Sequence, residues 1–143
     1  MAATVRGAVR ELLEQTIATM QALLEASDRE LAMPSSHACA QGKDLWTLIT
    51  NDIDHEKIHT GQVLEARYES RITSSPMQRL VAEWLAERAR FVGTLIGLTD
   101  EQFNSETAPG QWTYRVVAKH VLVLEQDSLK TLAADQAARR SGD

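Results

Sequence analysis

The chain has 143 residues, of which 43% are hydrophobic, and a formal net charge of −5, so its length fits one globular domain and is short for two. The acidic balance disfavours nucleic-acid partners, because a negative surface repels phosphate backbones. The single cysteine, Cys39, excludes an internal disulfide and a cysteine-based zinc site. There is no apolar run of ~20 residues and no secretory leader, so we expect a cytoplasmic protein without a membrane partner.

Four long segments carry apolar residues at helical spacing. Breaks rich in Gly, Pro and Ser separate them, and the third segment opens with Ser75 and Pro76, an N-cap residue followed by proline at the first helical position. No stretch alternates with period two for long enough to form a strand. The pattern therefore predicts an all-α fold, an up-down-up-down four-helix bundle that forms a single domain over residues 1–143. The breaks lie at 34–43, 72–76 and 104–111.

The two halves of the chain resemble each other. Residues 23–31 match residues 95–103 at an offset of 72, and Thr47 with the tryptophan before it matches Thr113 with its own tryptophan at an offset of 66. Both threonines are expected to be N-caps, and the first loop is expected to be six residues longer than the second. We therefore predict a pseudo-two-fold bundle. Its limits are about 3–70 for the first half, 75–137 for the second and 138–143 for a flexible tail.

Three histidines stand at positions where an inward helix face is expected to be apolar. His55 and His59 are four residues apart, so both imidazoles can reach one ion at ~2.0–2.1 Å. The alternative is a solvated pair on a helix edge. His120 interrupts the apolar stripe of the fourth segment in the same way, and its alternative is a hydrogen-bonded histidine in the core.

The repeat gives an estimate of how deep each histidine lies in its helix. His55 is eight residues after Thr47 and His120 is seven after Thr113, so both should lie roughly 10–12 Å into their helices. Since the second and fourth helices of such a bundle are parallel, we expect the three imidazoles to meet at one divalent ion. Three protein ligands with an open fourth position are typical of catalytic zinc sites, where the ion acidifies a bound water. Imidazole also suits nickel, iron and copper, and zinc and nickel are the expected cofactors.

Other ionisable side chains are candidates for supporting roles. Asp52, Glu56 and Glu125 are candidate acceptors for the imidazole N–H groups, with simple solvent exposure as the alternative. Arg88 interrupts the apolar stripe of the third segment and is a candidate contact to an anionic substrate group, with a structural ion pair as the alternative.

Two further patterns near these residues do not predict a metal site. His37 and Cys39 lie in the longer first loop without a matching ligand pair, so a surface loop is expected there. Glu56-x-x-His59 suggests a di-iron carboxylate site, but a second such motif would need a glutamate at Val117, and the di-iron interpretation is therefore excluded.

Two motifs resemble the DinB/YfiT-like family. Residues 98–120, with Trp112-Thr113 before the helix of His120, are similar to the family's opening unit, in which the first histidine of the helix binds metal. Residues 54–62, Asp-His-Glu-x-x-His-x-Gly-Gln, are similar to the helix that supplies the other two ligands. In the family the single-histidine unit comes first, so the halves are exchanged here. The resemblance implies a four-helix bundle, a divalent metal on His55, His59 and His120, and frequent homodimers.

Members of this family include thiol-dependent transferases and isomerases that use low-molecular-weight thiols, and many have no assigned reaction. We therefore expect a divalent-metal-binding protein, a metal-dependent enzyme of the transferase or hydrolase type acting on a small molecule, with catalytic residues that the sequence does not identify. The alternative is a non-catalytic bundle, metal-stabilised or metal-free, that serves as a dimeric interaction or structural protein.

Overall fold

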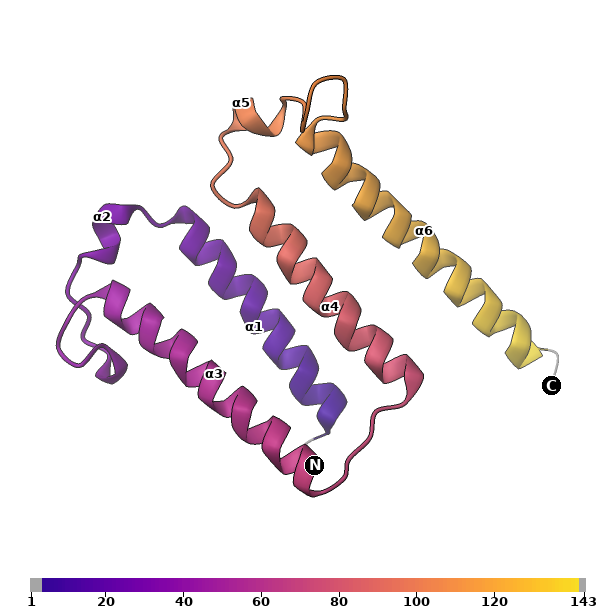
Figure 1. The fold of residues 1–143 in the computed structure, drawn as a ribbon, viewed down its shortest axis with the longest axis horizontal. Helices are drawn as coiled ribbons and strands as arrows, with labels where there is room; N and C mark the ends of the chain where they lie inside the picture. The colour runs from indigo at the N-terminus through magenta and orange to yellow at the C-terminus, as the bar shows by residue number, and fades with distance from the viewer. Residues whose placement is uncertain (1–3, 142–143) are drawn as a thin grey trace. The chain divides into compact units, whose positions relative to one another are not determined.

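The computed structural model describes residues 4–141, and all regular structure in that range is helical, without a strand. This confirms the all-helical class and the four long segments. No helix within the described range is long and apolar enough to cross a membrane. The long helices are α1 (Val5–Glu25), α3 (Leu45–Glu69), α4 (Pro76–Leu95) and α6 (Tyr114–Ser141), and the short ones are α2 (Asp28–Leu31), η1 (Ala38–Ala40) and α5 (Asp100–Phe103) (Figure 1).

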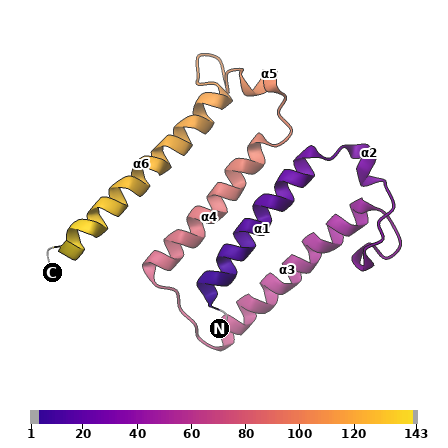
Figure 2. The same cartoon turned by 180° about the vertical axis from the view of Figure 1, so that it is seen from behind.

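The chain divides into two compact units, one that ends at Thr73 and one that starts at Ser74. In the first unit, α1 and α3 run antiparallel side by side and are joined through α2 and η1; in the second, α4 and α6 do the same through α5 (Figures 1 and 2). Each unit is therefore a helical hairpin. The tail expected over 138–143 is helical as far as Ser141, and residues 142 and 143 lie outside the described part.

The start of α3 differs from the prediction made from the sequence. Its N-cap is Asp44, whose carboxylate accepts hydrogen bonds from the backbone N–H of Thr47 at 2.8 Å and from the hydroxyl of Thr47 at 2.7 Å. These two bonds lower the pKa of Asp44 below its ordinary value. Thr47 is the third helical residue, and its predicted N-cap role is wrong because a carboxylate three residues earlier accepts both of its donors.

The starts of α4 and α6 follow the prediction. Ser75 caps α4 in a capping box with Gln78, and Pro76 is the first helical residue. Thr113 precedes α6, and its hydroxyl oxygen accepts a hydrogen bond from the backbone N–H of Val116 at 3.2 Å. Thr113 therefore caps its helix, as expected.

The two units use the same local hydrogen bonds to turn from their short helix into the following long one. Each short helix is preceded by an N-cap residue whose backbone N–H donates to a side-chain oxygen three residues on, from Ser27 to Glu30 at 2.7 Å and from Thr99 to Gln102 at 2.8 Å. Each loop is then closed by an isolated antiparallel bridge with flanking backbone bonds. The bonds are Leu45 N to Met33 O and Ser35 N to Lys43 O in the first unit, and Tyr114 N to Ser105 O and Thr107 N to Trp112 O in the second.

The two loops differ in length by less than expected. The first bridge joins Pro34 to Asp44 and encloses nine residues, whereas the second joins Glu106 to Thr113 and encloses six. The first loop is therefore three residues longer, not six, because the bridge aligns Asp44 rather than Thr47 with Thr113. Helix positions in the two units correspond when they are counted from these two caps.

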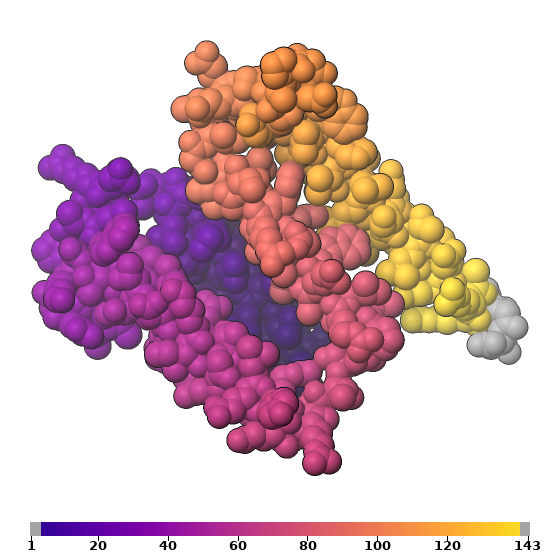
Figure 3. Space-filling model, in the orientation of Figure 1, coloured from indigo at the N-terminus to yellow at the C-terminus, as the bar shows by residue number. Residues whose placement is uncertain are grey.

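The longer first loop is attached to α3. It contains η1, which packs against α3, and the side-chain amide of Asn51 donates a hydrogen bond to the carbonyl of Cys39 at 2.7 Å. Ala40 in η1 is the only residue of the described range that is fully buried. In the space-filling view this loop is gathered around the first turns of α3 (Figure 3). The apolar residues of the four long helices are exposed by comparison, with Leu12 at 68% and Leu64 at 62%.

Candidate metal centre

His55 and His59 lie one turn apart on α3, and their rings face each other. The ring centroids are 4.5 Å apart and the ring planes are inclined by 33°. Both residues are exposed. This is the arrangement that i, i+4 spacing on a helix produces, and it leaves the two imidazoles on one side of α3. Two imidazole nitrogens so placed fit a divalent transition-metal ion such as zinc, nickel or copper.

His59 has a second polar contact that fixes its tautomer. Its Nδ1 lies 2.7 Å from Oε1 of Gln62. An amide oxygen only accepts hydrogen bonds, so Nδ1 must carry the proton and donate it. The lone pair of the neutral ring is then on Nε2, which is the nitrogen left for a metal ion.

His120 lies on α6, in the second unit, and its neighbour is aromatic. Its ring centroid is 5.1 Å from that of Trp112, with an interplanar angle of 67° that makes an edge-to-face contact. Trp112 stands just before the cap of the helix, and its ring contacts that of His120, the seventh residue of α6. The tryptophan that the repeat places before Thr113 is therefore also the neighbour of the predicted ligand.

The equal depth of His55 and His120, on which their predicted meeting depended, is wrong. His55 is the eleventh residue of α3 and His120 is the seventh of α6, a difference of about 6 Å along a helix axis. The residue of α3 at the level of His120 is Asn51. The pair and His120 belong to different units, and no group of three or more His, Cys, Asp or Glu side chains that could hold a metal is found across residues 4–141. The three-histidine centre remains a prediction.

The acceptor beside the histidine pair is the last residue of the 54–62 motif, Gln62, which was not among the expected acceptors. Asp52 and Glu56 are exposed on α3 and, in the described structure, make no hydrogen bond to either imidazole. Gln62 does so instead. Its spacing of three residues from His59, on the same helix face, is the signal that could have identified it.

The two charged candidates of the second unit pair with each other. The guanidinium of Arg88 on α4 donates a hydrogen bond to the carboxylate of Glu125 on α6, and the side chains are 33% and 30% exposed. The pair lies in a groove with apolar walls formed by Val81, Trp84, Leu85 and Leu129. The alternative for Arg88, a structural ion pair, is thus the contact observed, and Glu125 accepts from Arg88 rather than from a histidine.

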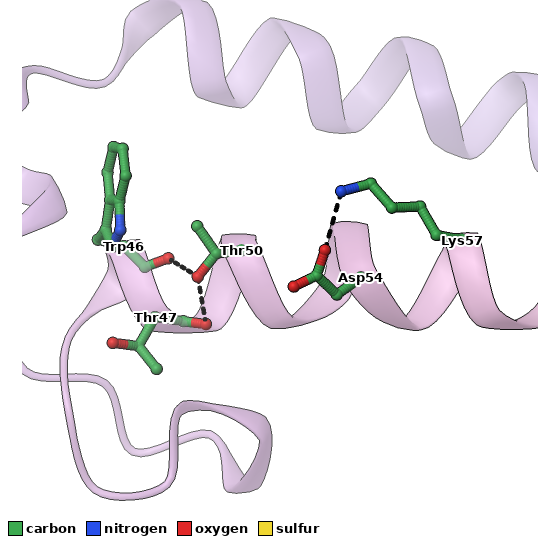
Figure 4. A network of polar contacts seen from close by, with 5 residues as sticks. All are labelled: Trp46, Thr47, Thr50, Asp54 and Lys57. Atoms are coloured by element: carbon green, nitrogen blue, oxygen red, sulfur yellow. Dashed lines mark hydrogen bonds and ion pairs between the residues drawn. The ribbon is translucent and has the colours of Figure 1, made fainter.

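His37 in the first loop and polar residues near the histidine pair on α3 contact residues close to them in the sequence. His37 caps η1, with its Nδ1 accepting from the backbone N–H of Cys39 at 3.2 Å, in the loop where it was expected. On α3, Lys57 forms an ion pair with Asp54 at 2.9 Å, and the hydroxyl of Thr50 donates to carbonyls of the preceding turn (Figure 4). The contacts of Lys57 and Thr50 stay within α3 and involve neither imidazole of the pair.

Comparison of the chain with family models, with curated proteins and with solved structures finds no match. The likeness to DinB/YfiT-like proteins therefore depends on the motifs of residues 54–62 and 98–120.

Proposed function

We propose that this protein binds a divalent transition-metal ion, zinc or nickel, through His55, His59 and His120, and that it is a metal-dependent enzyme of the DinB-like type. The observation that carries the proposal is the facing pair of imidazoles on α3, with Nδ1 of His59 bonded to Gln62. With that hydrogen bond in place, Nε2 of the neutral His59 ring keeps its lone pair for an ion.

The proposal includes a four-helix, up-down-up-down arrangement in which the two helical hairpins are related by a pseudo-two-fold axis. It is supported by the matching hydrogen bonds of the two loops and by the exposed apolar stripes of all four long helices. Burying one such leucine or valine side chain contributes about 1.5–3 kcal/mol, so these stripes favour packing of one hairpin on the other. The proposed arrangement requires an offset of about one helical turn between α3 and α6, because His55 is the eleventh residue of its helix and His120 the seventh of its own.

A bound ion would lower the pKa of a water or a low-molecular-weight thiol in its fourth position and so supply the nucleophile. The residues of the chain have narrower tasks. The three histidines hold the ion and leave one position open, and Gln62 orients His59. The Arg88–Glu125 pair gives the α4–α6 groove a polar floor where a small substrate could be oriented. As in the family it resembles, the protein would act as a homodimer.

Trp112 provides a direct test of whether His120 belongs to the metal site. In a protein carrying Trp46→Phe and Trp84→Phe, the fluorescence of Trp112 is followed while Ni²⁺ is added. Because the ring of His120 lies 5.1 Å from that of Trp112, nickel bound at His120 should quench the emission. His120→Ala should abolish the quenching, whereas His37→Ala should leave it unchanged.

Tight nickel binding with no quenching of Trp112 would show a site made of the α3 pair alone and would refute the three-histidine centre. A wild-type protein that binds neither Zn²⁺ nor Ni²⁺ would refute the function altogether and leave the metal-free dimeric bundle. Turnover is tested separately, by thiol transfer with the zinc-loaded and nickel-loaded protein, against His59→Ala as the control.

A further inference from the structure

The two histidines of the pair differ in their described contacts, because His59 has the side chain of Gln62 as a hydrogen-bond partner. His59 donates its Nδ1 proton to the amide oxygen of Gln62 at 2.7 Å, while the ring of His55 has the ring of His59 as its neighbour. A free neutral imidazole exchanges its proton between two nitrogens, and only the unprotonated nitrogen can bind a metal ion. A partner that occupies one nitrogen decides which nitrogen is free.

We propose that Gln62 is a positioning residue, which keeps the proton of His59 on Nδ1 and thereby presents Nε2 to the metal ion. This inference rests on the proposed metal site and names as the hydrogen-bond partner of His59 a residue other than Asp52 and Glu56, the acceptors expected on α3. The amide also fixes the ring in rotation, since the donor nitrogen must point along α3 toward the residue one turn further on. His59 therefore meets the ion already oriented.

The choice of an amide instead of a carboxylate has a chemical consequence. A neutral acceptor sets the tautomer without adding negative charge beside the ion, so the bound metal keeps more of its Lewis acidity than it would beside a carboxylate. Glu56, whose carboxylate lies on the same helix, makes no such contact with either ring in the described structure. The amide thus fits a site meant to acidify a ligand in the fourth position.

The tautomer can be measured in the full-length protein without any metal. Two-bond NMR correlations between the ring protons and the ¹⁵N nuclei, at about pH 8 where imidazoles are neutral, show which nitrogen is protonated. His59→Ala identifies the signals of residue 59. We expect the Nδ1–H form in the wild type and in Gln62→Glu, whose carboxylate also accepts, and a mixture of tautomers in Gln62→Leu.

Zinc affinity, measured by competition with a chelator, completes the test. Gln62→Leu should weaken Zn²⁺ binding about 10–100-fold, and Gln62→Glu should restore it to within a few-fold of the wild type. Gln21→Leu makes the same substitution at an exposed position of α1 and should change neither the tautomer nor the affinity. A merely structural role for Gln62 would not be rescued by glutamate in both measurements.

The outcomes separate this inference from the function on which it rests. If the wild type binds zinc tightly with His59 protonated on Nε2, or if Gln62→Leu changes neither measurement, the role of Gln62 is overturned and the metal site stands. If the wild type takes up no zinc, the proposed function fails, and the role of Gln62 in ligation fails with it.

Discussion

The ion pair between Arg88 and Glu125 allows a quantitative test of how α4 and α6 are joined. Fully exposed pairs contribute roughly 0.2–1 kcal/mol, and breaking a fully buried pair by removing one partner costs about 3–5 kcal/mol. With 33% and 30% of the two side chains exposed, and the apolar wall of Trp84 beside them, we expect a coupling free energy of about 1 kcal/mol. Arg88→Met and Glu125→Gln keep the aliphatic stems while removing the charges.

The assay is a double-mutant cycle of the free energy of unfolding, measured in urea. A matched cycle on Asp127 and Lys130, an exposed pair three residues apart on α6 with 64% and 78% of the side chains exposed, serves as the control and should give about 0.2–0.5 kcal/mol. If the Arg88–Glu125 coupling is no larger than that of the control pair, the groove does not shield the pair, and the reasoning from burial is refuted.

Three further predictions follow from the described contacts. His59→Ala should abolish tight metal binding and His37→Ala should leave it intact, as measured by calorimetric titration; the reverse result would mean that the ligands are wrongly assigned. Thr113→Ala should destabilise the protein by about 1 kcal/mol through loss of the α6 cap, and Thr47→Val should cost less than that if Asp44 is the true cap of α3, both measured by urea unfolding. Because hydrogen bonds from Thr47 lower the pKa of Asp44, the cap stabilises the fold above the ordinary carboxyl pKa and is lost as the pH falls through the lowered value. Asp44→Asn should therefore flatten the decline in stability between neutral pH and about pH 3, and an unchanged decline would contradict this.

The helices could be predicted from the sequence because their signals are local. Ser75 followed by Pro76 marks the start of α4 without reference to any other part of the chain, and Thr113 does the same for α6. The short helices α2 and α5 also have a local signal, because Ser27-x-x-Glu30 and Thr99-x-x-Gln102 carry the capping-box spacing.

The start of α3 was harder to predict because two residues compete for the same role. Asp44 and Thr47 are both good N-caps, and matching the tryptophans of the two halves favoured Thr47. The choice is settled by the antiparallel bridge from Pro34 to Asp44, a contact across the loop that no local propensity describes. The error of three residues carried directly into the estimated depth of His55.

Of the candidate site, only the contacts between residues of the same helix could be predicted from the sequence. His55 and His59 face each other because they are four residues apart, and Gln62 contacts His59 because it is three residues further along the same helix. A ligand from α6 would depend instead on how the two hairpins pack. The pairing of Arg88 with Glu125 also joins two helices, and spacing along the chain does not show which of several charged residues on one helix meets which on the other. Contacts between helices are therefore the part that spacing alone does not determine.

The hydrogen bond from Asn51 to Cys39 has a consequence for the role of the equivalent helix position in each of the two hairpins. Asn51 is seven residues after the cap of α3, and His120 is seven residues after the cap of α6, so they occupy the same position in the two hairpins. In the first hairpin that position is committed to anchoring the extra three residues of loop. The shorter loop of the second hairpin requires no anchor, which frees the equivalent side chain for other chemistry. Shortening the first loop by those three residues would release position 51 as well, and a histidine placed there would give the first hairpin its own copy of the position that His120 occupies.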